Sequence, residues 1–96
     1  MPKLSDAEIE QALNGLPGWS RDGDQIVREF QLGDFVEAMG FIVQVVVLPE
    51  RADHHPHLSN VYNRVTIALS SHDEGGITER DVRLATEINE RAGSPG

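Results

Sequence analysis

The first apolar residues of the chain recur at helical spacing, at Ile9, Ala12, Leu13 and Leu16. Ser5 stands before them as a helix N-cap, and Glu8 follows it by three residues, which is the spacing of a capping box. The segment 15–18 holds two glycines and a proline, and these residues end helices. The pattern therefore predicts an N-terminal helix that begins after Ser5 and ends near residue 15.

Alternation replaces helical spacing in the next part of the chain. Asp22-Gly23 is a hairpin-turn signal, and it lies between two short extended stretches. In the second stretch, Gln25–Leu32, apolar positions alternate with polar ones through Ile26, Phe30 and Leu32. We expect a β-hairpin here.

Residues 34–48 carry two signals. Phe35, Ala38, Met39, Ile42, Val45 and Val46 fit helical spacing, whereas the segment 43–47 is rich in β-branched residues, which favour strands. Pro49 cannot lie inside a regular helix. We interpret the segment as a helix that kinks or ends near Leu48, and a strand is the alternative.

From Leu58 to Ser70 the period becomes two, with Val61, Val65, Ile67 and Leu69 on one face. This pattern predicts one long strand. A turn through Asp73-Glu74-Gly75-Gly76 follows, and Thr78 with Asp81 then has the spacing of a second capping box. The last helix has an apolar stripe at Leu84, Ala85, Ile88 and Ala92.

The expected element order is therefore α-β-β-α-β-α. This order favours an α+β domain in which the helices pack on one face of an antiparallel sheet. At 96 residues the chain has room for one domain, which we assign to residues 1–92, with 93–96 as a flexible tail.

Composition narrows the classes of function. The net charge of −8 argues against direct binding to nucleic acid, which requires clustered positive charge. The chain has no cysteine, which excludes disulfides, thiolate metal sites and a cysteine nucleophile. We expect no secretory signal and no membrane span, because the longest apolar run is only Val45–Leu48. A cytoplasmic protein is the expectation.

Candidate chemistry is concentrated in the four histidines. Three lie in His54-His55-Pro56-His57, and His72 follows the long predicted strand. Imidazole can give and take a proton near neutral pH, so clustered histidines suit acid/base catalysis. The two groups become neighbours only if another strand or a second subunit brings them together. A plain polar loop and a histidine metal site are the alternatives, although adjacent histidines tend to diverge and no H-x-x-x-H spacing is present.

Other candidate residues have simpler structural interpretations. Asp81 is most economically a helix-capping residue, and Trp19 is more typical of a core or rim aromatic than of a stacking platform. Gly75-Gly76 lacks the full pattern of a phosphate loop and is interpreted as a turn. No serine stands in a recognisable nucleophile motif.

The histidine segment nevertheless resembles a known family. The stretches Glu50-Arg51-Ala52-Asp53-His54-His55-Pro56, Val61-Tyr62-Asn63-Arg64-Val65 and 71–81, in which Asp81 follows His72 by nine residues, closely resemble the pterin-4a-carbinolamine dehydratases. Gly18-Trp19 and the segment 34–39 also match that family's pattern, so the resemblance covers nearly the whole chain.

The resemblance implies a dehydratase that removes water from 4a-hydroxytetrahydropterin and gives quinonoid dihydropterin, without a cofactor or metal. This reaction recycles the cofactor of aromatic amino-acid hydroxylases, which makes such a hydroxylase a possible pathway partner. The positions that match the family's catalytic histidines are His54, His55 and His72. The implied substrate-binding set is Glu50, Pro56, Leu58, Ser71, Asp73, Glu74, Asp81 and Trp19.

Three residues depart from the family's pattern. Leu58 stands where the family usually has a large aromatic residue, Pro49 replaces a helix former, and His57 adds a titratable group. None of them removes a proton-transfer residue, so we expect activity to survive with altered substrate affinity. The alternative is a non-catalytic or dual-role assembly factor on the same fold. A homodimer or homotetramer is expected in either case, because the family forms both and a chain this short has a small core.

Overall fold

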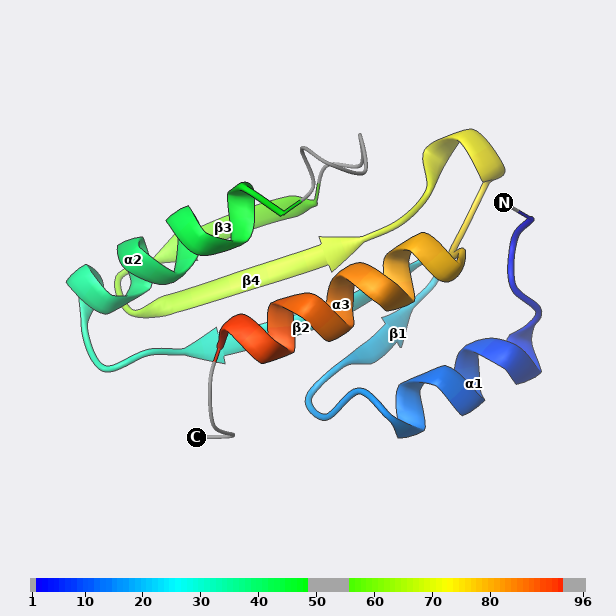
Figure 1. The fold of residues 1–96 in the computed structure, drawn as a ribbon, viewed down its shortest axis with the longest axis horizontal. Helices are drawn as coiled ribbons and strands as arrows, with labels where there is room; N and C mark the ends of the chain where they lie inside the picture. The colour runs from blue at the N-terminus through cyan, green and yellow to red at the C-terminus, as the bar shows by residue number, and fades with distance from the viewer. Residues whose placement is uncertain (1, 49–55, 93–96) are drawn as a thin grey trace.

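The computed structural model describes residues 2–48 and 56–92, and within them helices and strands form two layers. The elements are α1 (Asp6–Asn14), β1 (Ser20–Asp22), β2 (Gln25–Gln31), α2 (Phe35–Val46), β3 (His57–Val61), β4 (Arg64–Leu69), the 3₁₀ turn η2 (His72–Glu74) and α3 (Glu79–Arg91). The four strands form one antiparallel sheet in the order β1-β2-β4-β3, and Figure 1 shows α3 in front of β2, α2 in front of β3 and α1 beside β1. The predicted α+β class with an antiparallel sheet is confirmed.

Both predicted helix starts are confirmed in detail. The Ser5 side chain accepts from the Glu8 backbone N–H while Glu8 reaches back to the Ser5 N–H, and Thr78 and Asp81 form the second capping box. The ambiguous segment is helical and α2 ends at Val46, so the helix interpretation holds over the strand. The Asp22-Gly23 turn joins β1 to β2, and Gly23 has a φ of 62°. The predicted tail, 93–96, lies outside the described residues.

One expectation was wrong in detail. The stretch 58–70 is not a single strand but a hairpin, in which β3 and β4 pair antiparallel through Tyr62 and Asn63. The turn has no glycine, and Tyr62 adopts a φ of 52°. Asn63 interrupts the apolar face of the alternation and is a turn-favouring residue, but a single polar residue is a weak signal beside the long apolar pattern. The observed order is α-β-β-α-β-β-α, and β4 is an interior strand while β3 is an edge.

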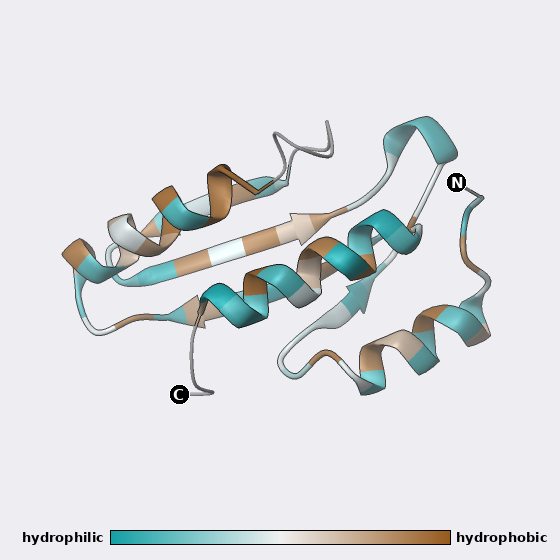
Figure 2. Cartoon of the chain, viewed as in Figure 1, coloured by the Kyte–Doolittle hydropathy of each residue, from teal (hydrophilic) through white to brown (hydrophobic). Residues whose placement is uncertain are grey.

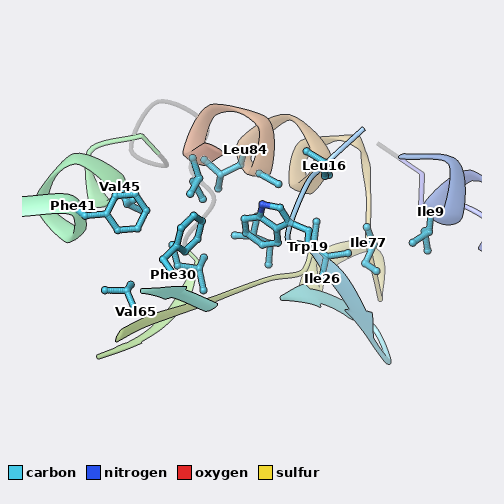
Figure 3. Close-up of a cluster of buried hydrophobic side chains, with 14 of the residues drawn as sticks. Ile9, Leu16, Trp19, Ile26, Phe30, Phe41, Val45, Val65, Ile77 and Leu84 are labelled. Carbon is cyan, nitrogen blue, oxygen red and sulfur yellow. The ribbon is translucent and has the colours of Figure 1, made fainter. Parts of the chain in front are cut away.

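The core lies between the sheet and the helices, as Figure 3 shows. Registered pairs of β2 and β4, such as Ile26 with Leu69 and Phe30 with Val65, put their side chains on the helix-facing side. Phe41 and Val45 of α2 meet them from one end of the layer, and Leu84 of α3 packs between. Apolar and polar residues therefore alternate in β2 and β4 because the apolar ones lie on the face covered by the helices, as expected of an antiparallel sheet.

Candidate active site

His72 lies in a closed turn at the end of β4. The backbone of Ser71 pairs with that of Gly76 through N–H···O bonds of 2.8 and 3.2 Å, which closes the loop around η2. Inside it, the Glu74 N–H donates to the Ser71 carbonyl at 3.0 Å, and Gly75 has a left-handed φ of 76° that suits glycine. The His72 side chain is exposed, so the turn holds its backbone while leaving the imidazole accessible.

A buried polar network anchors this turn to the start of α3. The side chains of Ser71, Thr78 and Asp81 are each fully buried. The Ser71 hydroxyl donates to Asp81 Oδ2 at 2.9 Å and lies 2.8 Å from Thr78 Oγ1, and Asp81 Oδ2 also accepts from the Thr78 backbone N–H at 2.9 Å. The capping interpretation of Asp81 is confirmed. Its predicted contact with substrate, and that of Ser71, stay predictions.

An ion pair ties the outer side of the turn to the same helix. Arg80 Nη2 donates to Asp73 Oδ1 at 2.7 Å. The hydrogen bond from Arg80 is the main reason that the pKa of Asp73 lies below its ordinary value, and the guanidinium charge adds to it. Asp73 is therefore held by Arg80, and the carboxylate keeps its negative charge beside His72.

His72 lines a small cavity of about 260 Å³ together with residues of the β1–β2 turn and of its own segment after β4. The lining residues are Asp22, Asp24, Gln25, Ser70, His72 and Gly75. The Ser70 hydroxyl donates to the Asp24 carbonyl at 2.8 Å, which holds the β1–β2 turn against the end of β4. Sequence reasoning missed Asp24 and Ser70, because only the register between β2 and β4 brings that turn here.

The β3–β4 hairpin answers the question of how the two histidine groups could meet. His57 pairs with Ala68 and Leu58 with Ile67, so the start of β3 lies beside the end of β4. Pro56 is one residue beyond the His57–Ala68 pair, at the end of the sheet from which Ser71 and His72 continue. A single strand would have kept the segment before it and the turn after it apart, whereas the hairpin returns the chain to the same end.

Apart from Trp19, the predicted site residues fall into three groups. Glu50, His54 and His55 lie outside the described residues, so their roles stay predictions. Pro56 and Leu58 are half-buried at the start of β3, and Leu58 packs against the core from the helix-facing side. The third group lies in the turn after β4 and at the start of α3, and its members are Ser71, His72, Asp73, Glu74 and Asp81.

Trp19 is a core residue, as its structural interpretation predicts. It is 6% exposed, meets Phe30 edge-on with ring centroids 6.3 Å apart, and donates its indole N–H to Asn89 Oδ1 at 2.8 Å. Asn89 Oδ1 also accepts from Arg28 at 2.7 Å. The Trp19 indole N–H is thus already engaged in joining the start of β1 to α3, and a contact with substrate stays a prediction.

A larger cavity lies elsewhere. It measures about 900 Å³ and is lined by the α1–β1 loop, β2 and the second half of α3, but by none of the predicted site residues. Its titratable lining groups are Arg28, Glu29 and Glu90, with no histidine. Arg28 donates to the Pro17 carbonyl and stacks 4.2 Å from the Phe30 ring centroid, which accounts for it as a structural link. Cavity size alone therefore does not identify the site. The smaller cavity is the better candidate because its lining includes the imidazole of His72.

The described part of the chain contains neither a candidate metal site nor a candidate membrane-spanning helix. Residues 2–48 and 56–92 contain no group of three or more histidine and carboxylate side chains placed to hold a metal ion. Within the same ranges no helix has both the length and the apolar character needed to cross a bilayer.

Comparison with known sequences identifies relatives over nearly the full length. A relative from Roseiflexus sp. (strain RS-1) is 48% identical, covering 92% of this chain and 95% of its own. One from Chloroflexus aurantiacus is 47% identical over 97% of this chain and all of its own. Both carry the provisional name pterin-4-alpha-carbinolamine dehydratase.

Solved structures agree on the fold. A transcriptional coactivator/pterin dehydratase from Brucella melitensis superposes with a TM-score of 0.91 at 40% identity, over 95% of this chain and 99% of its own. A pterin dehydratase-like protein identified as a RuBisCO assembly factor in the alpha-carboxysome has a TM-score of 0.65 at 20% identity, over 80% of this chain and 89% of its own, which shows the fold alone.

The family model for pterin 4 alpha carbinolamine dehydratase matches residues 2–91, nearly the entire chain. Together with the relatives that match along nearly their whole length, this match shows that the chain belongs to the pterin 4 alpha carbinolamine dehydratase family.

Proposed function

We propose that this protein removes water from 4a-hydroxytetrahydropterin and releases quinonoid dihydropterin. Family membership supports the reaction class. The observation that carries the proposal is the exposed His72 on a closed turn, lining a polar cavity at the end of the sheet where β3 begins. His54 and His55 precede that beginning in the chain, and we propose that they complete the site there.

The proposed chemistry is proton transfer. The carbon–oxygen bond at position 4a breaks, the departing hydroxyl takes a proton and leaves as water, and the ring system gives up a proton. Imidazoles suit both transfers because their ordinary pKa lies near neutral pH. His54, His55 and His72 are the proposed proton donors and acceptors.

The test is a direct assay with a matched pair of histidine variants. Enzymatically generated 4a-hydroxytetrahydropterin is supplied, and its disappearance is followed above the spontaneous rate. His72→Ala should lower the protein-dependent rate by roughly 10²–10⁴, the usual contribution of a positioned acid or base. His57→Ala is the control, since His57 is exposed on β3 and pairs through its backbone. It should act like the wild type.

Two results would count against this proposal. A wild-type protein that leaves the spontaneous rate unchanged at micromolar concentration would remove the dehydratase function. Equal rates for His72→Ala and wild type would remove His72 from the proton-transfer set while leaving the reaction in place.

A second proposal concerns association between copies of this chain, and it rests on an exposed surface. Five large apolar side chains on or just after α2 are exposed, and Figure 2 shows the apolar colouring of this helix. We call them the apolar α2 face: Phe35, Val36, Val43, Val46 and Val47. Their separations of 7, 8 and 11 residues put them on one side of the helix, away from the buried Phe41 and Val45. Such a face marks an interaction site more often than free surface.

We propose that a second copy of this chain covers the apolar α2 face. Such pairing matches the expected homodimer or homotetramer, because an identical apolar stripe on each copy is self-complementary. Within the described sheet β4 is interior, and the free edges are β1 and β3. The sheet edge at β3 is a second surface through which copies could pair.

A further inference from the structure

We propose that Ser71 and Thr78 position His72 for proton transfer, through a buried chain of hydroxyl groups that fixes the base of its turn. The inference rests on the proposed dehydratase function. It gives Ser71 a positioning role in place of the substrate contact that the family resemblance implies.

The chain of hydrogen bonds has one consistent direction. Ser71 has a single hydroxyl proton, and it donates that proton to Asp81 Oδ2 at 2.9 Å. The 2.8 Å contact between Ser71 Oγ and Thr78 Oγ1 must therefore be donated by Thr78. Thr78 Oγ1 in turn accepts from the Arg80 backbone N–H at 3.2 Å. Each hydroxyl thus both donates and accepts, which polarises and strengthens the chain in a buried environment.

The network fixes Ser71 from its side chain while the backbone fixes it again. Its N–H donates to Gly76 at 2.8 Å, and its carbonyl accepts from both Glu74 and Gly76. His72 is the next residue, so little freedom remains in where its Cα lies. Without the Ser71 hydroxyl, only backbone hydrogen bonds between Ser71, Glu74 and Gly76 would remain. These bonds close the turn on itself, but they do not fix its position relative to α3.

Position matters more for His72 than for its neighbours because a catalytic imidazole must reach its substrate within a fraction of an ångström. Displacements near 1 Å can cost about 10²-fold in rate. An apolar side chain could fill the volume of Ser71 at this fully buried position, but it could not link the end of β4 to the first turn of α3.

The test compares Ser71→Ala with Ser71→Thr and with a distant hydroxyl deletion. Ser71→Ala leaves the Thr78–Arg80 and Asp81–Thr78 bonds of the helix cap in place. We expect kcat to fall by about tenfold or more with KM little changed, since a misplaced imidazole weakens the transition state rather than binding. Ser71→Thr keeps the hydroxyl and should restore much of kcat.

The control is Thr86→Ala. Thr86 also donates a 2.9 Å hydrogen bond, to the Val82 carbonyl, but it is exposed and lies eight residues further along the chain than Thr78. Its loss should leave kcat and KM unchanged. Thr78→Val provides a second interruption of the hydroxyl chain and should lower kcat in the same way.

Amide hydrogen exchange separates positioning from general destabilisation. In Ser71→Ala, exchange should accelerate at Glu74 and Gly76, whose N–H groups close the turn, while core amides such as that of Ile67 keep wild-type protection. Unchanged kcat in a folded Ser71→Ala would overturn the inference and leave the dehydratase function standing. A fall in kcat with protection lost equally across the core would also overturn it. An inactive wild type would instead overturn the proposed function itself.

Discussion

Asp73 illustrates how a single exposed pair shapes the candidate site. Its carboxylate is held 2.7 Å from Arg80 Nη2, and this hydrogen bond lowers the Asp73 pKa. A group whose pKa is lowered on folding contributes stability above its ordinary pKa, here 3.8, and this contribution is lost as the pH falls through the lower folded value. At neutral pH the pair is intact, and it braces the outer side of the His72 turn.

We therefore expect Arg80→Met to raise the pKa of Asp73 toward 3.8, as measured by an NMR titration of its side-chain carboxyl signal. Arg83→Met is the matched control, because Arg83 is exposed on the same helix. It should leave the titration of Asp73 unchanged. Titration of Asp73 at its ordinary value in the wild-type protein would show that the ion pair does not form in solution.

The β3–β4 turn is the element on which the geometry of the site depends. Tyr62 is 63% exposed and adopts a φ of 52°, a conformation that costs most residues other than glycine about 1–2 kcal/mol. Hydrogen bonds from two asparagines stabilise the turn. Asn60 Nδ2 donates to the carbonyls of Tyr62 and Arg64. Asn63 Nδ2 donates to the Leu32 carbonyl, and the Asn63 carbonyl accepts from the Leu32 N–H. Neighbouring side chains therefore offset the strain.

Two substitutions at Tyr62 test this strain. Both Tyr62→Gly and Tyr62→Ala remove the aromatic ring, but only glycine tolerates a positive φ without cost. We expect Tyr62→Gly to be more stable than Tyr62→Ala by about 1 kcal/mol in urea unfolding, the reverse of their usual order in a strand. If the alanine variant proves the more stable, the left-handed turn is not the conformation in solution.

The same hairpin marks the boundary of what could be predicted from the sequence. Helix boundaries were predictable because capping signals are local: Ser5 with Glu8, and Thr78 with Asp81, act within one turn of chain. The hairpin was not predictable, because Tyr62 is of a residue type that favours strands. Its turn is stabilised by Leu32, about thirty positions away in the chain. Likewise, His72 was a candidate from its residue type alone, whereas only the structure showed which residues of the β1–β2 turn lie beside it.

At the scale of the whole molecule, the apolar α2 face is an exposed apolar surface that the fold of one chain does not cover. The protein buries one side of α2 through Ala38, Phe41 and Val45 and leaves the other exposed. An apolar surface of this kind on a small acidic domain favours association, which would also add burial to a modest core.

We expect the wild-type protein to run as an oligomer in size-exclusion chromatography with light scattering, and Val43→Glu to lower its mass toward that of one chain. Val43 is 63% exposed, so the charge should not disturb the fold of the subunit, but it would be costly to bury at an apolar interface. Gln44→Glu adds the same charge at the next exposed position and should leave the mass unchanged. A monomeric wild type would exclude the proposed self-association.

The sequence by itself determined the α+β class, the first and last helices with their capped starts, the β1–β2 hairpin and the candidate residue types, and it favoured a helix for α2. These features depend on local rules: periodicity of burial, capping and turn propensity act over a few residues. Only the tertiary structure decided that the stretch 58–70 folds back on itself, that the end of β4 meets the start of β3, and that Ser71, Thr78 and Asp81 share one buried network. Those contacts depend on strand register and on packing between elements distant in the chain, which no local pattern encodes.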